Sequence, residues 1–403
     1  MSGRWRVLTL MTTAQAGAAV VQQALGALSP IFVTTFGLSK AQLGVMFTAL
    51  MLGSACFVGA AGVLTDRWGE RRILLFSGMA MTFALLAATL FVSYWWIVAC
   101  IGVFGAGYAA STPAGGRAIL AWFDRDRGFA MGIRQTGVPV GGLFGALTLP
   151  LVAHVTGYRG AFAYAAFIVA VTTLIAYAGY REQRDDGAPA TTLGSVVRGM
   201  HVLARDPRLI GVTLTCMVLV SAQSGLNAFF TVTGVAVVGT SAAVAALAFA
   251  CAQGAAVFGR LAWGYLSDRV LHGERLIPFA AICVLAAVGA AAVSLMHFGT
   301  VVVLFGAAIV LGLSAAGWNG LMAATISEVG GSERAASALG ITLTAIFLTS
   351  SIAPIGFGTL ADHTSLRVAW TATAALAVLG VAPVLWLRGH LAMPRRRDAR
   401  GGG

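Results

Sequence analysis

Three arginines, Arg117, Arg134 and Arg260, stand inside stretches of sequence that are otherwise apolar enough to cross a membrane. A guanidinium in such a place is costly and normally faces a cavity or a partner. Its planar fork binds a carboxylate through two parallel hydrogen bonds. Arg260 lies eight residues before Asp268, which places it about 12 Å inward along a helix at 1.5 Å per residue. We therefore expect Arg260 to hold an organic anion, with a structural arginine bonded to helix carbonyls as the alternative.

Further polar residues accompany Arg260 in the predicted spans. Arg134 and Arg117 belong to consecutive antiparallel helices joined by a short loop, so they lie at similar depth and repel each other unless an anion or acceptor lies between them. Both are also long enough to snorkel to the inner surface. The uncharged candidates for substrate contact, for which interhelical hydrogen bonding is the competing role, are Gln23, Tyr108, Gln223, Asn227 and Asn319.

The acidic residues are absent from the middle of every predicted span. All fourteen fall in loops or at helix ends, and the six histidines do the same. The sequence therefore offers no group at mid-membrane to bind a cation or relay a proton. It contains no Walker loop, no metal-ligand cluster and no nucleophile triad, so we expect neither an enzyme nor a cofactor. The five cysteines fall inside apolar runs and are interpreted as core residues.

The elements that carry these residues are predicted to be membrane helices. Of the 403 residues, 58% are hydrophobic and 10% charged, against roughly 25% charged in a soluble domain. The net charge of +12 is spread over the gaps between apolar runs, which indicates a bilayer rather than a nucleic acid as partner. Breaks at charges, glycines and prolines predict twelve helices, at 7–36, 41–64, 73–93, 96–122, 128–155, 161–180, 209–236, 241–266, 276–297, 301–327, 335–361 and 367–387.

The basic residues predict the orientation of these helices. With a cytoplasmic N-terminus, twenty Lys and Arg residues fall on the inside and three on the outside, so both termini are expected in the cytoplasm. A bacterial inner membrane is the expected location. The long polar stretch 181–207 is interpreted as a linker, either solvated or with an amphipathic helix around 196–205. It separates two six-helix bundles, 1–180 and 208–403, the second ending in a basic cytoplasmic tail.

The two bundles repeat each other at an offset near 200 residues, which indicates a duplicated fold. Parallel repeats around a central cavity are how one large class of transporters is built. The paired segments are 62–72 with 264–275, 127–133 with 334–341, and 158–162 with 366–370.

The first of these segments carries a recognisable motif. Its pattern is Gly-x-x-x-Asp-Arg-x-Gly-x-Arg-Arg, present as Gly62, Asp66, Arg67, Gly69, Arg71 and Arg72. The second copy keeps Gly264, Asp268 and Arg269. On these residues the whole chain resembles the major facilitator superfamily of secondary transporters. The resemblance implies that both loops latch the two halves in the outward-open state. Independently of the family, Gly62 and Gly69 are expected to permit close helix approach and a tight turn, and Asp66 to accept hydrogen bonds.

Within that superfamily, the segment 259–269 resembles the eighth helix of the monocarboxylate and oxalate/formate carriers, where an arginine engages the substrate carboxylate. The resemblance implies this role for Arg260. The segment 132–142 resembles the fifth-helix glycine–proline motif, but Pro139 is displaced by one position, so an antiporter assignment does not follow. The mid-membrane aspartate and lysine of those carriers are absent, and Lys40 is the only lysine.

Two functions remain in competition. One is a secondary transporter that moves a monocarboxylate or short dicarboxylate by alternating access, either by exchange or with a proton entering beside the substrate. The other is an exporter of drugs or amphipathic compounds, which commonly uses an acidic residue for cationic substrates. Three arginines and no carboxylate inside the spans favour the anion. We expect the protein to act as a monomer.

Overall fold

The computed structural model describes residues 3–123, 127–182 and 205–390, and this part of the chain is helical with no strand. Its first half begins with one crossing broken by a 3-10 turn, because α1 (Gly3–Ala24), η1 (Leu25–Leu28) and α2 (Ser29–Phe36) follow one another directly. The remaining helices of this half are α3 (Lys40–Trp68), α4 (Glu70–Ala87), α5 (Tyr94–Trp122) and α6 (Arg127–Gly179).

In the second half, two of the helices end in short π-helical segments. α8 (Pro207–Thr233) continues into η2 (Gly234–Val238), and α9 (Ala242–Tyr265) continues into η3 (Leu266–Val270). The other helices are α10 (Leu276–Ser294), α11 (Val301–Leu313), α12 (Asn319–His363), α13 (Leu366–Leu379) and α14 (Val381–His390). The expected linker helix around 196–205 falls almost wholly in residues 183–204, outside the described residues.

Two helices are too long for one crossing of a core of about 30 Å. α6 has 53 residues and α12 has 45, which at 1.5 Å per residue is roughly 80 and 70 Å. Gly157 interrupts α6 with φ 70° and ψ −178°, a conformation that glycine adopts without steric cost, and it separates the predicted fifth and sixth crossings. The predicted tenth crossing instead breaks within 314–318, and its second part runs into the eleventh as α12.

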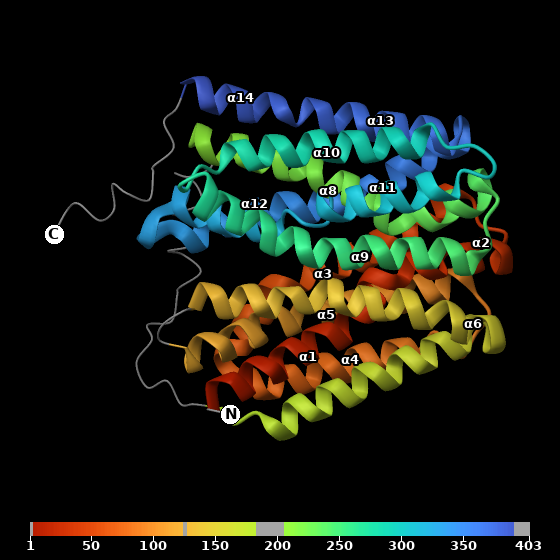
Figure 1. The fold of residues 1–403 in the computed structure, drawn as a ribbon. Helices are drawn as coiled ribbons and strands as arrows, with labels where there is room; N and C mark the ends of the chain where they lie inside the picture. Colours follow the sequence, from red (N-terminus) through yellow and green to blue (C-terminus); the bar gives the residue numbers. More distant parts are fainter. Residues whose placement is uncertain (1–2, 124–126, 183–204, 391–403) are drawn as a thin grey trace.

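The helices form two bundles. α1, α3, α4, α5 and α6 pack on one another, as do α8 to α14, and the two groups meet chiefly where α3 packs against α12 and α6 against α9. Figure 1 shows the first group, in red to yellow, below the second, in green to blue. α1 begins and α14 ends at the same end of the molecule, which we call the terminal end, and the opposite one the far end. The predicted fold, twelve membrane helices in two six-helix bundles, is confirmed. The boundaries at 180 and 208 stay a prediction.

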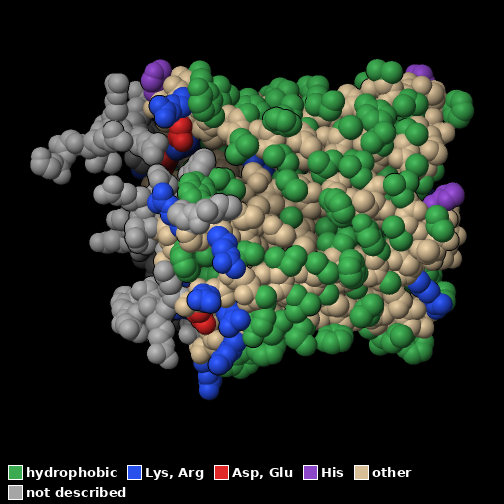
Figure 2. Space-filling model, turned by 60° about the horizontal axis from the view of Figure 1, so that its bottom comes forward, with side chains coloured by type: hydrophobic (Ala, Val, Ile, Leu, Met, Phe, Trp, Pro, Cys, Tyr) green, Lys and Arg blue, Asp and Glu red, His purple; other side chains and the backbone are tan. Residues whose placement is uncertain are grey.

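The surface is that of a membrane protein. Large apolar side chains such as Phe83, Phe167, Phe258 and Ile352 are exposed. On the face in Figure 2, apolar side chains cover the middle, and charged ones gather mainly at the terminal end. In the described chain, nine helical segments satisfy the length and hydropathy of a membrane span. Since lipid solvates apolar side chains, this exposure is the expected one for an integral membrane protein.

At the far end the two bundles are joined by direct contacts. Both carboxylate oxygens of Asp362, at the end of α12, accept backbone N–H groups at the start of α3, from Lys40 at 2.9 Å and Ala41 at 2.8 Å. The Thr231 hydroxyl of α8 donates to the carbonyl of Gly26. A Cβ on Gly44 would collide with the backbone of Pro354. The far end is therefore closed by packing and hydrogen bonds.

Candidate functional site

Arg134 lies at the centre of the first bundle, with 1% of its surface exposed. Its Nη2 donates to Gln15 Oε1 at 2.6 Å and to the carbonyls of Thr112 at 3.2 Å and Ser111 at 3.4 Å. Gly115 makes room for it, because a Cβ there would lie 2.7 Å from Nη2. These contacts fix the guanidinium between α1 and α5.

The amide of Gln15 connects Arg134 to Tyr108. Its Nε2 donates to Tyr108 Oη at 3.1 Å while its Oε1 accepts from the arginine. The tyrosine hydroxyl keeps its own proton available for donation, because it accepts in this pair. Gln15, which was not predicted, therefore joins the predicted candidate Tyr108 to Arg134.

Arg260 reaches the same region from the second bundle. It is 9% exposed on α9. Its Nε donates to the carbonyl of Ala316 at 3.3 Å, and its Nη1 donates across to the carbonyl of Gln135 at 2.9 Å. Gln135 is the residue after Arg134. The two buried arginines thus come from different bundles and meet beside the same turn of α6.

Neither arginine is neutralised within the described part of the chain. The salt bridges found there join Lys40 to Asp362, Arg117 to Glu70, and Arg275 to Asp268 and Glu328. The Nε of Arg134 is buried without a hydrogen-bond partner in these residues. Two uncompensated guanidinium groups at this depth cost several kcal/mol. An anion bound between them offsets that cost through charge-assisted hydrogen bonds.

A second polar group lies further toward the far end. Asn227 Nδ2 donates to Gln23 Oε1 at 2.9 Å, which joins α8 to α1 across the bundles. Gln253 of α9 lies beside them, because a Cβ on Gly142 would come within 2.8 Å of Gln23 and 2.9 Å of the Gln253 amide. Gln23 and Asn227 are predicted from the sequence, whereas Gln253 is not. Its position seven residues before Arg260, two turns along the same face, is the signal that identifies it.

The remaining predicted candidates lie at varying distances from this centre. Asn319 Nδ2 donates to the carbonyl of Ala316 at 3.4 Å, the oxygen that also accepts from Arg260. Gln223 is half-buried, one turn from Asn227. Arg117 has an acceptor of its own, because its Nε lies 3.7 Å from Glu70 Oε2 at the terminal end. Its contact with substrate stays a prediction.

The predicted latch residues lie at the terminal end. Gly69 has φ 83°, so the tight turn is confirmed, and a Cβ there would collide with the carboxylate of Glu182. The close approach predicted at Gly62 is not found among the described residues, since none of their atoms lies within 4 Å of a Cβ built there, and the same holds for Gly264. Arg67, Arg72 and Arg269 are exposed, and the Asp66 side chain lies outside the described residues.

Arg71 and Asp268 form contacts within their own bundles. The Nε of Arg71 donates to the carbonyl of Tyr177 at 3.1 Å, and its guanidinium stacks 4.3 Å from that ring's centre. Asp268 pairs with Arg275 at 2.8 Å. A latch between the two bundles stays a prediction.

Two bundles of membrane helices, each contributing a buried arginine that has no carboxylate partner among the described residues, define a membrane carrier. The sequence profile of the Major Facilitator Superfamily matches residues 11–354, and the chain belongs to that family. It is a secondary transporter of this type, embedded in a lipid bilayer.

Similar proteins cover the whole chain or parts of it. An uncharacterized MFS-type transporter of Mycobacterium tuberculosis is 28% identical, with 99% of this chain and 89% of that protein covered. A bacterial homolog of the human lysosomal transporter Spinster, in an inward-facing and occupied conformation, superposes with a TM-score of 0.81 at 16% identity, covering 96% and 97% of the two chains.

Two relatives that match about a third of the chain have names that point to different substrates. A probable sulfoacetate transporter of Cupriavidus necator is 26% identical over 33% of this chain and 31% of its own length. A multi-drug resistance efflux pump of Streptococcus pneumoniae is 24% identical over 36% of this chain and 38% of its own length.

Proposed function

We propose that the protein carries a small organic anion, a monocarboxylate or short dicarboxylate, across the membrane by alternating access. The observation that carries this proposal is the pair Arg134 and Arg260, buried, unpaired with carboxylates in the described residues, and contributed by different bundles. A guanidinium has five N–H donors in a fixed fork, and the protein carbonyls use only some of them. Similarity to a probable sulfoacetate transporter supports an anionic substrate.

The same geometry supplies a mechanism for reorientation. In the empty site two like charges from opposite bundles lie near each other and resist closer approach. An anion that bonds to both removes this repulsion and joins the bundles through its own oxygens. The loaded carrier then closes around the substrate more readily than the empty one. This difference between loaded and empty protein is what exchange of one anion for another requires.

We propose exchange in preference to proton coupling, with both termini in the cytoplasm and an inner-membrane location. The exchange proposal rests on the absence of acidic residues and histidines from the middle of the predicted spans. Counterflow into vesicles preloaded with unlabelled substrate should then greatly exceed net uptake. Strong uptake driven by an inward proton gradient, without internal substrate, would favour the proton-linked alternative.

The anion assignment is tested by ligand-induced stabilisation of the purified full-length protein. Short carboxylates and sulfonates should raise its unfolding temperature by mass action, and organic amines should not. Arg260→Lys should weaken that binding about tenfold or more, since a hydrogen bond to a charged group contributes about 1.5–3 kcal/mol and an ammonium does not reproduce the fork. Arg269→Lys, at the exposed end of the same helix, is the matched control. Stabilisation by amphipathic cations alone would support a drug exporter, the alternative that the efflux-pump similarity favours.

A further inference from the structure

Gln253 is a buried amide without a hydrogen-bond partner. It is 1% exposed on α9, and neither its Oε1 nor its Nε2 has a partner in the part of the chain that the structure describes. Burying an unbonded amide costs free energy, about 1–3 kcal/mol in proteins. Leucine or methionine at this position would avoid the cost. The retained amide therefore points to a ligand that bonds with it.

The surroundings of Gln253 place more unsatisfied polar atoms at the same level. Asn227 Oδ1 is also buried without a partner among the described residues, although Nδ2 of the same amide bonds to Gln23. Gly142 leaves the space into which Gln23 and Gln253 project, as the 2.8 and 2.9 Å approaches to a Cβ there show. The amides of Gln23, Asn227 and Gln253, from α1, α8 and α9, therefore lie together, and two of them carry atoms without a partner among the described residues.

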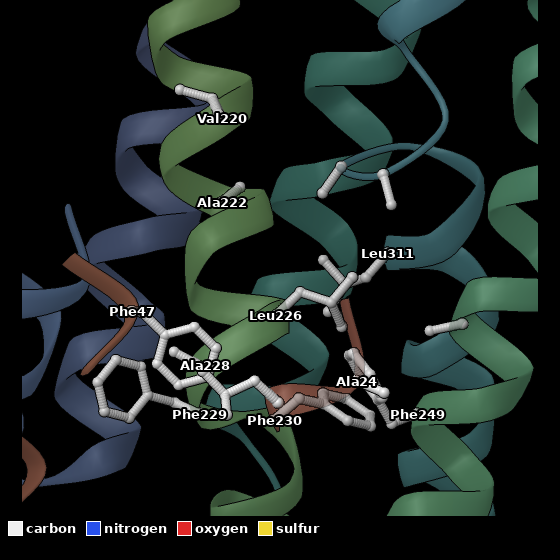
Figure 3. Packing of buried hydrophobic residues seen from close by; sticks show 14 of the residues in the cluster. Ala24, Phe47, Val220, Ala222, Leu226, Ala228, Phe229, Phe230, Phe249 and Leu311 are labelled. Atoms are coloured by element: carbon white, nitrogen blue, oxygen red, sulfur yellow. The ribbon is translucent and has the colours of Figure 1, made fainter. Parts of the chain in front are cut away.

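This group of amides is bounded on both sides. Toward the far end lie the apolar residues Ala24 and Phe249, which are side by side in Figure 3 and are both buried. Toward the terminal end lies Arg260, seven residues along α9, a separation of about 10 Å along the helix axis. The site therefore has a cationic pole and a neutral, hydrogen-bonding pole, with an apolar wall beyond the second.

We propose that Gln253 is a specificity-determining residue, and that the substrate is a bifunctional organic anion. Its acidic group binds Arg260 and Arg134, and an uncharged polar group at its other end, a hydroxyl or carbonyl, bonds to the amide of Gln253. This inference rests on the proposed function and specifies its substrate class. An amide offers a donor and an acceptor, so a hydroxyl satisfies it in either direction.

The Gln253 amide distinguishes one substrate from another by whether the substrate supplies it with a hydrogen-bond partner. An unsubstituted acid fills the cationic pole but leaves the Gln253 amide without a partner, whereas a hydroxy acid of suitable length satisfies both. One net neutral hydrogen bond changes an affinity by about fivefold. Because the discrimination belongs to the amide and not to the arginines, the two poles are separable by mutation.

The test measures binding of matched acids to the purified full-length protein by calorimetry. The probes are hexanoate with 6-hydroxyhexanoate, and butyrate with 4-hydroxybutyrate. Wild type should prefer one of the hydroxy acids over its parent by about fivefold. Gln253→Met, which keeps the length and removes the amide, should abolish this preference and leave the parent acid's affinity within about twofold. Gln253→Asn, which keeps the amide on a shorter side chain, should retain part of it.

Two controls separate this inference from the anion proposal. Arg260→Lys should weaken both acids of a pair equally, by about tenfold or more. Gln22→Met removes a half-buried amide whose Oε1 also lacks a partner in the described residues, on a neighbouring face of α1, and should change nothing. If Gln253→Met weakens the binding of both acids of a pair equally, or leaves the preference unchanged, the proposed role of Gln253 is overturned and the anion proposal is not. Failure of wild type to bind any of the four acids would overturn both proposals.

Discussion

The terminal ends of the two bundles carry clusters of similar composition and opposite arrangement. In the first, Glu70 is buried, accepts the Tyr180 hydroxyl at 2.6 Å and lies 3.7 Å from the Nε of Arg117. Its backbone N–H also donates to a second acid, Glu182. A carboxylate stands at the centre, so we call these four residues the carboxylate-centred cluster.

The second bundle places an arginine at the centre. Arg275 is 5% exposed and binds Glu328 through both ends of the carboxylate, at 3.0 and 2.6 Å. It also binds Asp268 at 2.8 Å and the Ser267 hydroxyl at 2.9 Å. We call these four residues the arginine-centred cluster. In the arginine-centred cluster one guanidinium is shared by two carboxylates. In the carboxylate-centred cluster two neighbouring acids share one arginine, so we expect the pKa of Glu182 there to be raised.

The largest expected effect comes from breaking the arginine-centred cluster. Arg275→Leu leaves two acids without their shared partner, and breaking a buried pair costs about 3–5 kcal/mol. Since the side chains of Asp268 and Glu328 are 39% and 33% exposed, we expect the lower end of that range. Denaturant unfolding in detergent measures it. Arg269→Leu, exposed on η3, should cost far less, and equal losses would contradict the central role of Arg275.

A smaller effect is expected from Tyr180→Phe in the carboxylate-centred cluster. It removes one hydrogen bond to the buried Glu70, which contributes about 1.5–3 kcal/mol when the acceptor is charged. The same unfolding assay measures this loss. In the background of Glu70→Gln the loss should shrink, because the acceptor is then neutral. If the tyrosine change costs the same in both backgrounds, the bond to Glu70 is not its source.

The smallest expected effect is a dependence of stability on pH, which we expect from the carboxylate-centred cluster and not from the arginine-centred one. Burial, a side-chain hydrogen bond with Glu70 and repulsion from its carboxylate raise the pKa of Glu182, and outweigh the backbone N–H of Glu70 and the charge of Arg117, which lower it. A folded pKa above the unfolded one adds stability below about pH 4.3 that is lost as the pH rises through the folded value. Glu182→Gln should flatten this slope and change neutral-pH stability by less than about 0.5 kcal/mol. An unchanged slope of stability against pH would refute the assignment.

No such slope is expected from the arginine-centred cluster. Burial lowers the pKa of Arg275, but the contacts with Glu328 and Asp268 outweigh it and raise the pKa above its ordinary value. Because the pKa of Arg275 is raised in the folded protein, its contribution to the free energy of unfolding is fully present below its unfolded pKa. That contribution therefore stays constant through the neutral and acidic range as far as the acids remain ionised.

The sequence predicted the helices well because membrane crossing imposes length and hydropathy on each segment separately. It predicted the breaks less well. The interruption at Gly157 falls at a predicted gap, but the one at 314–318 falls inside a predicted helix, since no charge or proline marks it. Similarly, the pairing of Arg117 with Glu70 joins residues from different helices, and no local spacing indicates it.

The sequence identified a residue of the candidate site only where burying that residue in a membrane helix costs much free energy. Arg134 and Arg260 are identified by the cost of a charge in a membrane helix. Gln15 and Gln253 carry no charge, so in one sequence they resemble any glutamine that bonds a neighbouring helix. Their roles depend on which atoms lack partners, and that depends on how α1, α5, α6 and α9 meet.

The closure of the far end has a consequence for how this protein varies during evolution. Both hydrogen bonds accepted by Asp362 come from the main chain of residues 40 and 41, which any amino acid except proline supplies. The Lys40 ammonium, 3.9 Å away and 37% exposed, adds little. For these two bonds, only the residue at 362 depends on the identity of its side chain. Among descendants of this gene, position 40 is free to drift while the acid at 362 persists, and the two positions should show no correlated substitution.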